Sequence, residues 1–353
     1  MASQPNAFWI IRLSSLGDIV VTTSALSWLK AKFPSVPIFF ITSQEYAPLF
    51  THDPRITQVF AYNRSPNVLA FIHFIRHVLN PAMRIHGGEL IDLHSNLRSR
   101  ILRHLCPLPT SVIIHKHTLA RLFVCTTKID ILNHRKPLAY GIVDQLQQRY
   151  GVLPSSNLIS IKPKLYPPPS DNSALHQKWK LQPNPSYIGM VPTAMWAGKR
   201  WPAAHFIQLI HLIQSQTSYR CIIFGGPRDT YGHDIAKHTD AINTTGQLSL
   251  SEVMTLMKHC CKMVIANDTG LMHMADALNI PTCAILGPTT TSMGYPPLGV
   301  HSFCVERNIW CRPCSRNGQA PCIRLAQRTC LRDLSPQTVF ETCKKNWNWA
   351  CSG

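Results

Sequence analysis

The chain has 353 residues, 45% of them hydrophobic, which is enough to bury the cores of two domains of ordinary size. Its formal charge of +18 favours anionic partners such as a nucleic acid, a phosphorylated substrate or an acidic membrane surface. No run of about 18 apolar residues is present, and the N-terminal FWIIRL meets Arg12 too soon for a signal peptide, so we expect a protein that stays in the cytoplasm.

Short β-rich runs alternate with helix-length segments through both halves of the chain, which is typical of parallel sheets covered by helices. The first half contains predicted strands at residues 7–13, 36–41, 56–62, 89–94 and 111–115. The second half contains predicted strands at residues 187–192, 221–226, 263–268 and 281–288. Periodicity is lost between them at residues 162–172, where four prolines indicate a linker.

This pattern predicts an α/β protein with two doubly wound domains that face each other across a cleft. We place the first domain at residues 1–165, the second at 166–334 and a helical tail at 335–353. In such sheets ligands bind beyond the carboxyl ends of the strands, in the loops that lead into helices. The candidate functional residues are therefore sought in those loops.

The stretch NDTGLMHMADAL follows a predicted strand and opens a predicted helix. Thr269 and Gly270 thus lie in the first turn, where backbone N–H groups lack intrahelical partners and attract phosphate. Asp268 has the wrong charge for a phosphate and suits sugar hydroxyls on the same ligand. His273, four residues after Thr269, can face the same end of the helix. The alternatives are an ordinary helix cap at Asp268 or Thr269 and a structural histidine.

A second strand-to-helix loop, PTAMWAGKRWP at residues 192–202, carries Lys199 and Arg200. It predicts another anion site on the same edge, because a nucleotide diphosphate needs positive charge from more than one side. The alternative is a solvated basic pair beside a packed Trp201.

In the first half, RLSSLGD places Asp18 at the start of a helix after the first strand. A carboxylate there is a candidate general base that would take a proton from an attacking hydroxyl; a simple helix cap is the alternative. The loop has no GxGxxG, so a Rossmann dinucleotide site is not favoured. Further on, LIDLHSNLRSR places His94, Arg98 and Arg100 where an acidic acceptor can dock, or on an ordinary solvated helix face.

Three ordered motifs resemble a known family: RLSSLGDIVVTTSAL, PTAMWAGKRWP, and NDTGLMHMADALNIPTCAILGPTT followed by PPLG. Together they are similar in order and spacing to the bacterial ADP-heptose:lipopolysaccharide heptosyltransferases of glycosyltransferase family nine. The resemblance implies a GT-B fold of two facing Rossmann-like domains, with the acceptor on the first and ADP-heptose on the second. It also implies inverting, metal-independent transfer, without a cofactor, to the Kdo or heptose residues of the lipopolysaccharide core.

The same resemblance assigns roles to residues and a place to the enzyme. Asp18 matches the family's proposed base, and Lys199 matches its diphosphate contact. The donor-sugar and phosphate motif is matched by Asp268, Thr269, Gly270 and His273. The acceptor, Kdo-lipid A or a heptosylated core, implies work at the cytoplasmic face of the inner membrane. No Asp-x-Asp pair, the usual holder of a divalent metal on a sugar nucleotide, occurs in the chain.

Seven of the 13 cysteines lie from Cys304 onward, and Cys311, Cys314, Cys322 and Cys330 follow the pattern C-x2-C-x7-C-x7-C. This spacing fits a structural zinc site, but reduced, packed thiols or oxidation fit it too.

Three other functions compete with heptose transfer. A transferase that uses another sugar nucleotide, or a sugar-nucleotide epimerase, has the same fold. The charge of +18 also fits a nucleic-acid-binding protein. Against that reading, the basic residues are dispersed and no RNA-binding or helix-turn-helix motif is present, while attraction to anionic lipid explains the excess charge equally well. We therefore expect no nucleic-acid partner.

Overall fold

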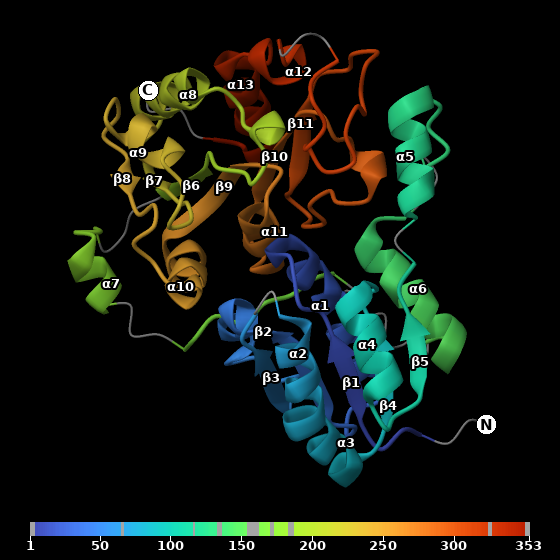
Figure 1. Ribbon diagram of the computed structural model, residues 1–353. Helices are drawn as coiled ribbons and strands as arrows, with labels where there is room; N and C mark the ends of the chain where they lie inside the picture. Colours follow the sequence, from blue (N-terminus) through green and yellow to red (C-terminus); the bar gives the residue numbers. More distant parts are fainter. Residues whose placement is uncertain are drawn as a thin grey trace. The chain divides into compact units, whose positions relative to one another are not determined.

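The computed structural model describes residues 4–64, 67–115, 117–132, 136–153, 162–169, 173–182, 187–323 and 327–349. It divides into two compact units (Figure 1). Unit 1 consists of Met1–Lys116 and Leu138–Pro168, and unit 2 of His117–Pro137 and Pro169–Gly353. The unit boundary at Pro168 and Pro169 falls inside the predicted linker.

Unit 1 is built on a five-stranded parallel sheet in the order β3-β2-β1-β4-β5. Its strands are β1 (Phe8–Ile11), β2 (Ile38–Ser43), β3 (Gln58–Tyr62), β4 (Glu89–Asp92) and β5 (Thr110–Ile113). Its helices are α1 (Leu16–Lys32), η1 (Gln44–Phe50), α2 (Val68–Phe74), η2 (Ile75–Leu79), α3 (Asn80–His86), α4 (Leu97–Leu105) and α6 (Leu138–Tyr150). Every residue of β1 and β2 is buried, as expected for strands that helices cover on both faces.

Unit 2 contains a six-stranded parallel sheet in the order β11-β10-β9-β6-β7-β8. Its strands are β6 (Tyr187–Val191), β7 (Arg220–Ile223), β8 (Ile242–Asn243), β9 (Cys261–Asn267), β10 (Thr282–Leu286) and β11 (Phe303–Glu306). Its helices are α5 (Thr118–Thr127), α7 (Ser173–Lys178), η4 (Ala197–Lys199), α8 (Ala203–Gln216), α9 (Tyr231–Ala236), α10 (Leu250–Cys260), α11 (Gly270–Ala277), η5 (Thr291–Met293), α12 (Thr329–Arg332) and α13 (Pro336–Trp347).

All nine predicted strands are found, and the prediction of two doubly wound parallel sheets is confirmed. The two strands that the sequence did not predict, β8 and β11, lie at the two edges of the second sheet. They have only two and four residues, too few to give a readable alternation of apolar side chains.

The order of the strands in each sheet determines which of the loops between strands and helices lie next to one another. In unit 1 the chain changes its direction of strand addition between β1 and β4, and in unit 2 between β6 and β9. Neighbouring loops diverge at such a point, which leaves space for a ligand beyond the carboxyl ends of the strands. The loops that carry the candidate residues follow these four strands.

The domain limits differ from the prediction in two places. Residues 117–137 belong to unit 2, because Val124 and Leu132 form a small core with Met293. The predicted tail is not separate either, since α13 packs against α8 and its Val339 and Phe340 join the core of the second sheet. Both contacts are distant in sequence, so local patterns gave no sign of them.

No helix in the described part of the chain is long and apolar enough to cross a membrane.

Replacement of Phe340 by alanine tests the place of α13 in the core. Phe340 is fully buried, so its loss should lower the free energy of unfolding of unit 2 by about 3–5 kcal/mol. Lys345→Ala, an exposed position on the same helix, should change it by less than about 0.5 kcal/mol. Urea denaturation followed by circular dichroism measures both values. Equal stability of the two variants would mean that α13 is not part of the core of unit 2.

Candidate functional site

The loops after β6 and β9 bring together the predicted donor-binding residues of unit 2. The Nζ atom of Lys199 lies 2.6 Å from Oδ2 of Asp268, and the pair is largely buried. The same Oδ2 atom accepts a hydrogen bond of 2.8 Å from the hydroxyl of Thr289, which follows β10. An ammonium group has three N–H donors and a carboxylate has two oxygens, so each partner keeps capacity to bind a ligand.

The buried carboxylate of Asp268 remains ionised. Burial acts to raise its pKa, but the charge of Lys199, the hydrogen bonds from Lys199 and Thr289, and the nearby His273 outweigh it. The net effect lowers the pKa below the ordinary value of 3.8. At neutral pH the site therefore contains a fixed pair of opposite charges.

No side chain caps the first turn of α11. Thr269 is the N-cap residue of this helix, yet its side chain makes no capping hydrogen bond, and Oδ2 of Asp268 is bonded to Lys199 and Thr289 instead. The alternative that Asp268 or Thr269 merely caps the helix is thus not what the structure contains. Gly270 begins the helix, and its neighbouring N–H groups are of the kind that binds phosphate.

His273 lies one turn into α11, and its side chain is buried. Its ring packs edge-on against Tyr295, with the ring centroids 6.2 Å apart. Tyr295 in turn lies under the guanidinium of Arg121 from α5, at 4.9 Å from the ring centroid. The sequence did not identify Tyr295 or Arg121, because neither belongs to a motif.

Residues that the sequence analysis did not identify support the loop at residues 192–202, which carries Lys199 (the Lys199 loop). Asn267 donates a hydrogen bond of 2.6 Å to the carbonyl of Pro192 and accepts one from the backbone N–H of Trp201. Gly318 has a φ of +85° and packs against the Lys199 stem so closely that an added Cβ would lie 2.6 Å from Cγ. A larger residue there would displace the lysine. These contacts fix both the backbone and the side chain of the loop.

The cysteine-rich segment also supports the loop after β10. The guanidinium of Arg312 donates hydrogen bonds to the carbonyls of Gly287 and Thr289, the latter at 2.7 Å. The same side chain forms an ion pair with Glu306 at 2.5 Å. Arg312 therefore holds the segment that presents Thr289 to Asp268.

In unit 1, Asp18 lies after β1 and forms an ion pair with Arg12, at 2.8 Å between Oδ2 and Nη2. Arg12 is buried and also donates to the carbonyl of Leu93, just after β4. The Asp18 side chain keeps 24% of its surface exposed, so it remains accessible to a substrate. The buried guanidinium of Arg12 thus connects the loops that follow β1 and β4. At this switch point unit 1 changes its direction of strand addition.

Asp18 also has the helix-capping function that was the alternative to a catalytic function. It is the third residue of α1 and forms a capping box with Ser15, whose hydroxyl lies 2.8 Å from Oδ2. Burial acts to raise the pKa of Asp18, but the charge of Arg12 and the hydrogen bonds from Ser15 have a larger, opposite effect. The pKa of Asp18 therefore lies below the ordinary value of 3.8. The group is ionised at neutral pH, which a proton acceptor requires.

The three weaker candidates of unit 1 do not share one face. His94 is buried, and its Nε2 atom lies 2.6 Å from the side-chain amide of Asn96, the N-cap of α4. Arg98 is half-buried, whereas Arg100 is exposed, and residues two positions apart point in different directions on a helix. The structure therefore places His94 and Arg98 near the switch point, but does not bring the two arginines together as a clamp.

The four cysteines with zinc-like spacing are free thiols. Burial and the neighbouring Cys330 and Cys311 raise the pKa of Cys314 to about 11, so these side chains influence one another. Within the described residues, however, no group of three or more His, Cys, Asp or Glu has the geometry of a metal site. The free thiols are consistent with the alternative of reduced, packed cysteines.

Comparison with known proteins gives a consistent result. Residues 160–321 match the model of glycosyltransferase family 9 (heptosyltransferase). The chain is 26% identical over 304 residues to lipooligosaccharide heptosyltransferase 2 of Haemophilus influenzae, covering 82% of this chain and 85% of the relative. It is 24% identical to lipopolysaccharide heptosyltransferase 2 of Escherichia coli, covering 94% of this chain and 96% of the relative.

Solved structures give the same fold. The ADP-heptose LPS heptosyltransferase II of E. coli superposes with a TM-score of 0.71 at 21% identity, over 96% of this chain and 98% of the other. A family 9 glycosyltransferase of Veillonella parvula superposes with a TM-score of 0.76 at 17% identity, over 98% of each chain. The predicted GT-B class, with two Rossmann-like sheets, is confirmed. The family model matches residues 160–321 and the two relatives align with most of the chain, so the predicted resemblance to the heptosyltransferases of glycosyltransferase family 9 is confirmed.

Proposed function

We propose that this glycosyltransferase moves heptose from ADP-heptose to the Kdo or heptose residues of the lipopolysaccharide inner core, with inversion at the anomeric carbon. The observation that carries the proposal is the uncapped first turn of α11 beside the buried Lys199–Asp268 pair. The relatives support the choice of sugar and acceptor, since those of H. influenzae and E. coli are lipooligosaccharide and lipopolysaccharide heptosyltransferases.

In this proposal the donor binds to unit 2 through its diphosphate. The N–H groups at Thr269 and Gly270 and the ammonium of Lys199 bind phosphate oxygens, and His273 lies at the same end of α11. Oδ2 of Asp268 holds Lys199 in place, which leaves Oδ1 to accept hydrogen bonds from sugar hydroxyls. When ADP departs, negative charge grows on its terminal phosphate, and these positive groups stabilise it.

Asp18 is the proposed general base for the acceptor. It takes the proton from an acceptor hydroxyl while that oxygen forms a bond to the anomeric carbon and the bond from that carbon to the phosphate oxygen breaks. The lowered pKa keeps the carboxylate ionised at neutral pH, and Arg12 holds it in one orientation. His94, Arg98 and Arg100 remain proposed contacts of the acidic acceptor.

We further propose that the enzyme works on the cytoplasmic surface of the inner membrane. Its acceptor is joined to a lipid, and a formal charge of +18 attracts the chain to anionic headgroups. The transfer needs neither metal nor cofactor in this proposal, because Lys199 and the helix end supply the positive charge.

A transfer assay tests the proposal as a whole. Purified protein receives ADP-heptose, a UDP-sugar or a GDP-sugar, with Kdo-lipid A or a heptosylated core in anionic vesicles as acceptor, with and without EDTA. We expect protein to pellet with the vesicles and ADP-heptose alone to be consumed, with an inverted linkage in the product and equal rates in EDTA. Turnover only with another nucleotide sugar, acceptor-independent conversion of the donor, or nucleic-acid binding without ADP affinity would contradict the proposal.

Replacement of Asp18 by asparagine should lower kcat by at least about 100-fold, because loss of a general base removes that much catalysis or more. ADP affinity should stay unchanged, since the donor binds to unit 2. Glu89→Gln is the control, because Glu89 lies at the amino end of β4 and should keep wild-type turnover. Turnover retained in Asp18→Asn would remove Asp18 from the mechanism.

Replacement of Lys199 by alanine should weaken ADP binding by about 10- to 100-fold, the value of one or two hydrogen bonds to a charged group. Titration calorimetry measures the affinity. Lys237→Ala removes an exposed lysine of the same unit, 70% of whose side chain is accessible, and should bind ADP like the wild type. Equal affinity in both variants would place the diphosphate elsewhere.

A further inference from the structure

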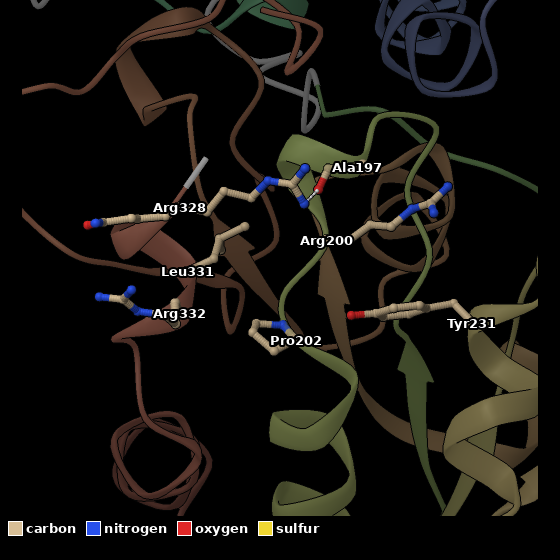
Figure 2. Close-up of a pocket in the computed structure, with 8 residues that line it drawn as sticks. Ala197, Arg200, Pro202, Tyr231, Arg328, Leu331 and Arg332 are labelled. Atoms are coloured by element: carbon tan, nitrogen blue, oxygen red, sulfur yellow. Dashed lines mark hydrogen bonds between the residues drawn. The ribbon is translucent and has the colours of Figure 1, made fainter. Parts of the chain in front are cut away.

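A basic cavity lies beside η4, because Ala197, the first residue of η4, is one of its lining residues. Its volume is about 370 Å³, within the range of small-molecule sites, and it is lined by residues of unit 2 only. Three of its lining residues are arginines, Arg200, Arg328 and Arg332, and none is acidic. Figure 2 shows that the arginines come from two elements, the loop before α8 and the segment around α12. Lys199 does not line this cavity, because its side chain pairs with Asp268.

Two of the arginines are held in place by the same loop. Arg200 donates from Nε to the carbonyl of Ala194 at 2.8 Å, and Arg328 donates from Nη1 to the carbonyl of Ala197 at 3.0 Å. A guanidinium has five N–H donors, so each anchor leaves most of the fork for a ligand. Arg332 differs, because Asp333 accepts from its Nε at 2.7 Å.

Tyr231 completes the polar lining. Its hydroxyl donates to the carbonyl of Trp201 at 2.8 Å, and its ring lies under Arg200 at 6.0 Å from the guanidinium carbon. Arg200, Arg328 and Tyr231 all line this one cavity.

The end of a helix adds to the positive potential. Pro202, which lines the cavity, is the N-cap of the 14-residue helix α8 and provides no side-chain cap. The first N–H groups of α8 and the positive end of its dipole are thus directed toward this region. Arginine forks from separate elements together with a helix end suit a tetrahedral, multiply charged oxyanion better than a single planar carboxylate.

We propose that this cavity is a second anion site, distinct from the donor site, and that it binds a phosphate group. The phosphate is either free inorganic phosphate or the phosphomonoester headgroup of a lipid. Arg200 and Arg328 are its main ligands, and Arg332 is a contact at its rim. Because Arg328 bonds to Ala197 and η4 runs from Ala197 to Lys199, a bound phosphate stiffens the turn that carries the donor-site lysine.

Calorimetry with inorganic phosphate tests the site in the full-length protein. Wild type and Lys199→Ala should both show saturable binding, because the proposed donor lysine is not needed. Arg328→Gln and the double variant Arg200→Gln/Arg328→Gln should weaken it at least about tenfold, as expected for loss of hydrogen bonds to a charged group. Arg220→Gln, an exposed arginine at the amino end of β7, is the matched control and should bind normally. Thermal unfolding confirms that each variant is folded.

A vesicle assay distinguishes the two sources of phosphate. Phosphatidylcholine vesicles with and without phosphatidic acid are sedimented with wild type, Arg328→Gln and Arg220→Gln. If phosphatidic acid vesicles capture the protein through Arg328 and free phosphate does not bind, the site is for a lipid headgroup. If free phosphate binds through Arg328 and the vesicles do not capture the protein, the site is for inorganic phosphate. Absence of both, or binding that Arg328→Gln leaves intact and Lys199→Ala removes, overturns the proposal. Loss of Asp18-dependent transfer would leave this result untouched, so the two proposals fail separately.

Discussion

Each sheet changes its direction of strand addition at one pair of neighbouring strands, and the candidate site depends on this constraint. The nine residues predicted to act in catalysis, donor binding or acceptor binding all follow one of the four strands at these switch points, β1 and β4 in unit 1 and β6 and β9 in unit 2. The carboxyl ends of parallel strands lie on one edge, so residues far apart in sequence meet there. Lys199 and Asp268, 69 positions apart in the chain, form an ion pair of 2.6 Å for this reason.

At each switch point a carboxylate is paired with a cation. Asp268 is paired with Lys199, and Asp18 with the buried Arg12. Isolated charges at these depths would be costly, and pairing keeps them ionised. The pairs differ in access, because Asp18 is more exposed than Asp268. This difference fits an attacking group at Asp18 and a tightly held donor at Asp268.

The cysteine-rich segment has a structural function that its spacing did not suggest. Arg312 holds the carbonyls of the loop that carries Thr289, and Gly318 packs on the stem of Lys199. Arg328, ten residues after Gly318, donates a hydrogen bond to the carbonyl of Ala197 at the start of η4. The segment after β11 therefore contacts the Lys199 loop at two points, the stem of Lys199 and the carbonyl of Ala197.

The sequence by itself determined the two parallel sheets and the loops at their functional edges. Buried parallel strands require continuous apolar runs, and a helix start after such a run reveals Asp18, Lys199 and Asp268. Only the tertiary structure decided that α5 and α13 belong to unit 2, that Thr289 binds Asp268, and that Arg200 and Arg328 share a cavity. These contacts join side chains separated by tens of residues or more, and their geometry depends on how helices pack on a sheet. Periodicity and motifs describe only residues that are close along the chain, so they cannot predict such contacts.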